Sequence, residues 1–117
     1  MKKIEIAKGT RIVMHSNELL FLAHSGQPYR GSVHLSFVSV GESFDTREFK
    51  RYITSLRSCT FYAEDIAYEI YTKIASSIKT DSLGVIVSLS ARGGIAQRLS
   101  YGEDFVVEHK NNIFQIG

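Results

Sequence analysis

The stretch that decides the fold covers residues 44–94, because it contains two helical patterns followed by a strand pattern. It reads FDTREFKRYITSLR at 44–57, FYAEDIAYEIYTKIASSIK at 61–79 and LGVIVSLSARGG at 83–94. In the first segment, apolar side chains recur at the spacing of one helical face. They are Phe49, Tyr52, Ile53 and Leu56. The pattern predicts a helix that Ser43 or Asp45 caps.

The second helix is expected from near Thr60 to about Lys79. Its isoleucines fall every four residues, and Glu64 and Asp65 stand in its first turn, where negative charge suits the helix dipole. The apolar stripe consists of Ile66, Ile70, Ile74 and Ile78, widened by Ala63, Ala67 and Tyr71. A strand then follows, in which Leu83, Val85, Val87 and Leu89 alternate with other residues. The run 92–94, Arg-Gly-Gly, is expected to break or bulge this strand.

The flanking regions read as strands and turns. The sequence predicts one or two short strands within 2–23, a loop at 24–31, a strand at 32–37, a turn at 41–43 and further strand at 97–107 and 112–116. The order of strands, two helices and strands predicts an α+β fold with two helices packed on one face of an antiparallel sheet. Because both edges of such a small sheet look unprotected, we expect subunits to pair edge to edge into a homo-oligomer.

Length and composition exclude several classes of protein. The 117 residues predict a single domain, 1–117. The net charge of +2, from 14 basic and 12 acidic residues, is too small to indicate nucleic acid or an anionic membrane surface by itself. No segment resembles a signal peptide or a membrane span, so no membrane partner is expected. The one cysteine, Cys59, allows no intramolecular disulfide, and a reducing, cytoplasmic location is the default expectation.

Several motifs occur in register over residues 20–102 and together resemble one family. They are Ser-Gly-Gln-Pro at 25–28, Asp-Thr-Arg-Glu-Phe-Lys-Arg-Tyr at 45–52, Ser-Leu-Arg at 55–57, Phe-Tyr-Ala-Glu at 61–64, Ala-Arg-Gly-Gly-Ile at 91–95 and Tyr-Gly at 101–102. This set is similar to the 7-cyano-7-deazaguanine nitrile reductases, the QueF family. The resemblance implies the tunnelling fold, in which antiparallel sheets with two helices on one face assemble into an oligomeric barrel. It also implies a guanine-like ligand (a purine, pterin or 7-deazaguanine) held between subunits.

The resemblance implies a set of ligand-binding residues. Glu64 stands where the superfamily places a carboxylate that accepts hydrogen bonds from the guanine-like edge. Without the resemblance, Glu64 would read as an ordinary acid of the first helical turn. Tyr29 and Tyr62 could stack on a heterocycle or simply pack, and His24 lies in the loop of the expected site.

The resemblance also suggests a cofactor site. Arg47, Lys50 and Arg92 fall where the family's bases hold the phosphates of NADPH. The alternative is a solvated helix surface, and for this chain the cofactor stays open. Gly93 and Gly94 could let the backbone approach a ligand, although a bulge is the commoner reason for such a pair. The four histidines, His15, His24, His34 and His109, show no metal-binding spacing, and no metal site is expected.

The catalytic positions of the family are changed. Leu22 replaces the nucleophilic cysteine, Tyr29 the proton-donating aspartate and Ala63 the assisting histidine. Leucine and alanine cannot form the covalent intermediate or transfer a proton, so nitrile reduction is not expected. Cys59 precedes the second helix and is either a substitute nucleophile or an inert thiol.

Three functional hypotheses follow. The first is a tunnelling-fold protein that binds a 7-cyano-7-deazaguanine-like ligand with altered chemistry, in a queuosine-type pathway of nucleic-acid modification. The second is a pterin or purine enzyme of the same superfamily that uses His24, Tyr29 or Tyr62. The third is a non-enzymatic oligomeric module that binds a partner or nucleic acid through Lys2, Lys3, Lys8, Arg11 and Arg30.

Overall fold

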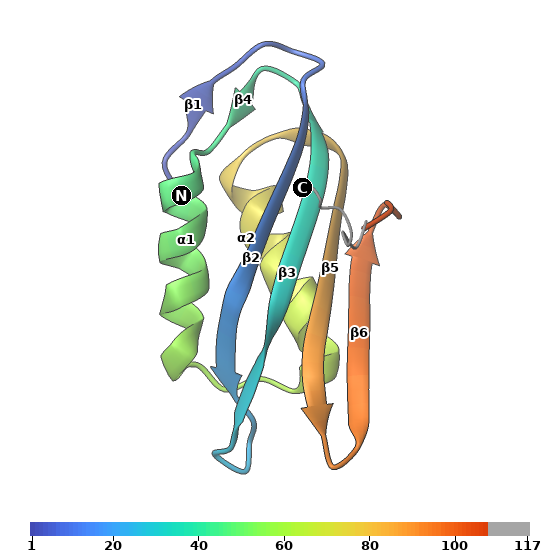
Figure 1. Ribbon diagram of the computed structural model, residues 1–117. Helices are drawn as coiled ribbons and strands as arrows, with labels where there is room; N and C mark the ends of the chain where they lie inside the picture. Colours follow the sequence, from blue (N-terminus) through green and yellow to red (C-terminus); the bar gives the residue numbers. More distant parts are fainter. Residues whose placement is uncertain (108–117) are drawn as a thin grey trace.

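The computed structural model describes residues 1–107, which form an antiparallel sheet with two helices on one of its faces (Figure 1). The four long strands are β2 (Arg11–Leu22), β3 (Pro28–Ser39), β5 (Thr80–Arg92) and β6 (Ile95–Gly102), in the spatial order β2-β3-β5-β6. Two short strands, β1 (Ile4–Glu5) and β4 (Glu42–Ser43), pair separately. The predicted α+β class is confirmed, whereas the strand predicted at 112–116 lies outside the described residues.

Two predictions about the first half of the sheet were wrong. The N-terminal region was expected to hold only short strands, but β2 has 12 residues. The loop predicted at 24–31 is shorter, because Pro28 already begins β3. Proline lacks an amide hydrogen and is tolerated at the first position of a strand. The hairpin between β2 and β3 is closed by the Ala23 amide, which donates to the Gln27 carbonyl at 2.8 Å.

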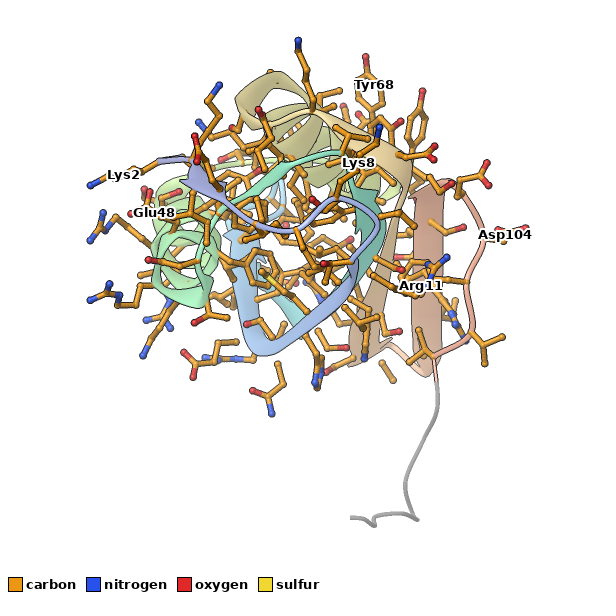
Figure 2. All side chains as sticks on the ribbon, turned by 90° about the horizontal axis from the view of Figure 1, so that it is seen from above. Lys2, Lys8, Arg11, Glu48, Tyr68 and Asp104 are labelled. Atoms are coloured by element: carbon orange, nitrogen blue, oxygen red, sulfur yellow. The ribbon has the colours of Figure 1, made fainter. Side chains whose placement is uncertain are left out.

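The first helix, α1 (Thr46–Ser55), starts at a capping aspartate. The Asp45 carboxylate accepts a hydrogen bond from the Glu48 amide at 3.0 Å, which satisfies one of the free donors of the first turn. A 3-10 turn, η1 (Leu56–Ser58), continues the helix. The main chain of Lys2 donates to the Glu48 carboxylate at 3.0 Å, and Figure 2 shows the two residues side by side.

The second helix begins later than predicted. Residues Ala63–Asp65 form a 3-10 turn, η2, and α2 covers Ile66–Ser77. The reason lies in the preceding segment, where Thr60 bridges to Leu22 at the end of β2 and the Phe61 amide donates to the Leu22 carbonyl at 3.0 Å. This extended pairing excludes a helix start at Thr60, so Glu64 and Asp65 lie just before α2 and not in its first turn.

The core lies between the helices and one face of the sheet. The predicted isoleucine stripe of α2 is buried, with Ile66, Ile70 and Ile74 fully inaccessible to solvent. The alternating residues of β3 and β5 meet it from the sheet; they are Val33, Leu35, Phe37, Leu83, Val85, Val87 and Leu89. Burial of these apolar side chains is the main stabilising contribution to the fold. Neither helix in residues 1–107 is long and apolar enough to span a lipid bilayer.

Strand β2 contains a β-bulge that changes which residues face the helices. Ser16 pairs with Val33, whereas Leu19 pairs with Gly31, so β2 uses one residue more than β3 over this interval. Before the bulge, Ile12 and Met14 pack against the core, and after it Leu19 and Phe21 are buried there. Since side chains alternate along a strand, the extra residue reverses the alternation.

The glycine pair after Arg92 forms a tight hairpin. Gly93 and Gly94 have φ angles of +60° and +84°, and Arg92 pairs with Ile95 across them. Two residues with positive φ are the signature of a type I′ turn, which matches the twist of paired strands. The predicted break at 92–94 is therefore a two-residue turn between β5 and β6.

The sheet face opposite the helices is mostly polar. It carries the exposed Arg30 of β3 and Arg98 of β6 and the half-buried Ser32 of β3 and Ser88 of β5. Ser32 and Arg98 pair with Ser88 from either side. At Gly84 this face is covered, because a Cβ atom there would lie 2.0 Å from the Glu103 carbonyl oxygen and 3.0 Å from the Phe105 ring. The rest of this surface, called the open face below, has no helix over it (Figure 1).

Candidate functional site

The residues predicted to bind a ligand come from segments that meet at one end of the molecule. His24 lies in the β2–β3 hairpin, Tyr29 is the second residue of β3, and Tyr62 and Glu64 lie in the segment before α2. Figure 1 shows this hairpin, this segment and the β5–β6 hairpin at the same end, away from β1 and β4.

Glu64 presents its carboxylate toward β6. Its Oε2 atom accepts a hydrogen bond from the Gln97 side-chain amide at 3.1 Å, and Glu64 is exposed to solvent. Gln97 pairs with Leu89, so it points to the helix side of the sheet. No sequence motif indicates Gln97, because only the register between β5 and β6 brings it to Glu64. The neutral amide can give way to a ligand with better donors.

His24 and Tyr62 form an aromatic pair in the segments that lead to this site. Their ring centroids are 4.0 Å apart and the rings are inclined by 26°, which is a stacked arrangement. Tyr62 is 60% exposed, so its ring has a free face. Stacked aromatic rings are a usual surface for a planar heterocycle. The structure therefore places His24 and Tyr62 together, and Tyr62 precedes Glu64 by two positions in the chain.

Tyr29 belongs to a neighbouring cluster. Its ring stacks on Phe21 with a centroid distance of 5.1 Å, and the Arg92 guanidinium lies 4.4 Å from the centre of the Tyr29 ring. Arg92 also donates a hydrogen bond to the Gln27 side chain. The cation–π contact and this hydrogen bond hold Arg92 against the β2–β3 hairpin. Arg92 therefore lies with the candidate ligand-binding residues. It does not lie with Arg47 and Lys50, the other two bases of the predicted cofactor site.

Arg47 and Lys50 lie elsewhere. Both belong to the first half of α1, which starts next to β4, whereas Arg92 ends β5 at the opposite end of the molecule (Figure 1). Arg47 is engaged with Asp45, at 3.4 Å between guanidinium and carboxylate. Both bases line a cavity of about 490 Å³ with residues of β2. The three bases of one chain therefore do not form one site for the phosphates of a dinucleotide.

The positions at which the resemblance predicts reactive groups lie in the same region. The Leu22 amide donates to the Cys59 carbonyl at 2.9 Å, and Ala63 is buried with 2% exposure. The Cys59 thiol lies 3.6 Å from the Ser55 carbonyl oxygen, to which it donates. Residues 1–107 hold no group of three or more His, Cys, Asp or Glu side chains that could bind a metal ion.

Comparison with known proteins identifies similar sequences. No family model matches the chain. It is 32% identical over 71 residues to the NADPH-dependent 7-cyano-7-deazaguanine reductase of Rickettsia felis and 34% identical over 71 residues to that of Rickettsia akari. Each match covers 61% of this chain, which spans 25% of the length of those relatives. The resemblance to this reductase family inferred from the motifs is thereby confirmed.

The fold also has a solved counterpart. The crystal structure of the archaeosine synthase QueF-Like in the apo form superposes with a TM-score of 0.71, over 87% of this chain and 99% of the other. Sequence identity is 16%, so this likeness concerns the fold. It confirms the predicted tunnelling-type arrangement of two helices on an antiparallel sheet.

Proposed function

We propose that this chain binds a 7-cyano-7-deazaguanine-like heterocycle at the end of the sheet where Glu64, Tyr62 and His24 meet. The observation that carries the proposal is the accessible Glu64 carboxylate, held by a single neutral donor at 3.1 Å, with the His24–Tyr62 stack built on the residue two positions earlier in the chain. The reductase relatives are named for this heterocycle, which supports the choice of ligand class.

The chemistry of recognition follows from the groups present. The Watson–Crick edge of a guanine-like base offers adjacent N–H donors, and a carboxylate accepts two of them at once. Binding would exchange the Gln97 amide for these donors, while the ring lies against the free face of Tyr62. Tyr29 and Arg92, already in contact, would form the adjoining wall.

Nitrile reduction is not part of the proposed function. Leu22 and Ala63 have no group that can attack a nitrile or transfer a proton, and both stand where the resemblance places reactive groups. We infer a role in 7-deazaguanine modification of nucleic acid that consists of binding the heterocycle, with any turnover depending on groups other than these two.

A homo-oligomer is part of the proposal. Strands β2 and β6 are the two edges of the sheet, and each pairs with only one neighbouring strand. Exposed edges favour pairing with another chain, and a second copy is the natural partner in a closed barrel. Light scattering should give a mass that is a multiple of the 13.1 kDa chain. A monomer at micromolar concentration would contradict this part.

The test of ligand binding is calorimetric titration with 7-cyano-7-deazaguanine and with guanine. We expect binding by the wild-type protein and a loss of about tenfold to hundredfold in affinity for Glu64→Gln, since a hydrogen bond to a charged group contributes roughly 1.5–3 kcal/mol. Asp65→Asn is the matched control, because it removes a carboxylate from the same turn. Equal losses for both variants, or no binding by folded wild-type protein, would refute the proposed site.

A further inference from the structure

A second cavity lies on the open face, at the β2 bulge. Its volume is about 690 Å³, and strands β2, β3 and β5 contribute its walls. Glu64, Tyr62 and His24 do not line it. The cavity and the Glu64 site lie on opposite faces of the sheet. Ser88, which lines the cavity, pairs with Arg98 on the open face, whereas the next pair, Leu89 with Gln97, points to the helices.

Several of the polar groups in this cavity are donors without partners. Within residues 1–107, the Arg30 guanidinium makes no hydrogen bond or ion pair, and neither do the hydroxyls of the three lining serines. These serines are Ser32, Ser88 and Ser90. Arg98, directly opposite Ser88 on the same face, is also unpaired in the described part of the chain. A solvated sheet surface would equally expose such groups, but it would not gather them around a hollow.

The charge of the cavity favours an anion. Its one carboxylate, Glu18, is 3.8 Å from the Arg57 guanidinium, which offsets the negative charge. Arg30 then remains as the uncompensated cation of the lining, and Arg98, which does not line the cavity, stands across from the lining residue Ser88. Farther along the open face, Arg11 donates to the Ser36 hydroxyl at 3.2 Å. In Figure 2, Arg11 lies on the side of the sheet away from Tyr68 of α2.

We propose that the open-face cavity binds a phosphate ester, with Arg30 of the lining and Arg98 beside it supplying charge and the serine hydroxyls supplying further hydrogen bonds. Guanidinium groups suit phosphate because their paired N–H donors match two phosphate oxygens. The hydroxyls of Ser32 and Ser88, which pair across β3 and β5, can donate to the remaining phosphate oxygens. The phosphate ester is either a free nucleotide or the backbone of a nucleic-acid strand, which share this chemistry.

The experiment uses two probes on the full chain: adenosine triphosphate in calorimetry, and a fluorescein-labelled oligothymidylate of about ten nucleotides in anisotropy. Arg30→Gln and Arg98→Gln are compared with Lys79→Gln, which removes the same charge from an exposed residue after α2 that does not line the cavity. We expect each arginine variant to weaken binding by about fivefold to tenfold, and the lysine variant by less than about twofold. Arg30 is exposed, so its replacement leaves the fold intact, which circular dichroism checks.

The two probes separate the sources of the phosphate. Binding of the nucleotide alone supports a free nucleotide, and tighter binding of the oligonucleotide with a steep dependence on salt supports a backbone. Absence of binding to either probe, or equal weakening by Arg30→Gln and Lys79→Gln, overturns the proposal. Arg30→Gln should not alter the titration with 7-cyano-7-deazaguanine, and Glu64→Gln should not alter phosphate binding. Each of the two proposed sites can therefore be refuted without refuting the other.

Discussion

Leu22 and Cys59 are joined through their backbones, with the Leu22 amide donating to the Cys59 carbonyl at 2.9 Å. Leu22 ends β2, and Cys59 begins the short extended segment that leads to Glu64. The chain's one thiol therefore lies next to the position at which the resemblance expects a nucleophile. Its side chain, however, donates to the Ser55 carbonyl, in the last turn of α1.

Restoring the thiol at position 22 tests whether the lost nucleophile is what prevents covalent chemistry. We expect Leu22→Cys to form an adduct with 7-cyano-7-deazaguanine, because a thiol can add across a nitrile. The sulfur–carbon bond forms, one π bond of the nitrile opens and the thiol proton moves to nitrogen, so no group leaves. Intact-mass spectrometry should show a gain equal to the whole ligand.

Cys59 supplies the control for this experiment. The wild-type protein, which retains Cys59, should show no adduct, and Leu22→Cys in a Cys59→Ser background should still show one. An adduct on the wild-type protein would instead identify Cys59 as a reactive thiol. Loss of the adduct on adding Glu64→Gln would link the reaction to the proposed binding site.

Tyr52 offers a test of stability and of its dependence on pH. The ring is buried under α1 with 9% exposure, and its hydroxyl has no hydrogen-bond partner within the described residues. Tyr52→Phe should therefore leave the free energy of unfolding unchanged or raise it by up to about 1 kcal/mol, whereas Tyr52→Ala should lower it by roughly 3 kcal/mol. Denaturant unfolding measures both, and a clear loss for Tyr52→Phe would show that the hydroxyl has a partner.

Burial, reinforced by the charges of Glu69 and Cys59, raises the pKa of Tyr52 well above its ordinary value of 10.0. A raised pKa in the folded state stabilises the fold below the unfolded value, and this contribution is lost as the pH rises above it. Wild-type protein should thus lose more free energy of unfolding than Tyr52→Phe when the pH is raised from about 9 to about 11, a range of about one unit on either side of the ordinary tyrosine pKa. Urea unfolding measures this difference.

Asp45 offers the opposite dependence on pH. The hydrogen bond from the Glu48 amide lowers the pKa of the Asp45 carboxyl. Desolvation opposes this shift in part, and the positive charge of Arg47 adds to it. This stabilisation is present above the unfolded value of 3.8 and is lost as the pH falls through the folded one. Asp45→Ala should lower the melting temperature at neutral pH. Asp45→Asn keeps a capping acceptor and should lower it less, while removing the acid dependence.

The sequence predicted the core because helical and strand periodicities are local properties. The stripe of Phe49, Tyr52, Ile53 and Leu56 is buried as expected, and so is the isoleucine stripe of α2. The start of α2 was predicted too early because Thr60 and Phe61 pair with Leu22, nearly forty positions away in the chain. Such a long-range hydrogen bond overrides local helix propensity, and no local pattern reports it.

The candidate site was only partly predictable for the same reason. The motifs selected His24, Tyr62 and Glu64, which the fold brings to one end of the molecule. Gln97 could not be selected, because its contact with Glu64 depends on the register of β5 and β6. Arg92 was grouped with Arg47 by resemblance, whereas the β5–β6 hairpin places it on Tyr29. Whether these residues bind a ligand stays a prediction.

The bulge in β2 makes this strand tolerant of one particular change in length. Its halves before and after residues 17–18 are out of phase in the sequence, and the extra residue lets both halves keep their apolar side chains on the core. Deleting Asn17, an exposed polar residue, would remove the extra residue and leave Ile12, Met14, Leu19 and Phe21 in one regular alternation that still faces the core. An in-frame deletion at this surface position should therefore be less damaging than a deletion elsewhere in β2, which would turn one half of the strand over.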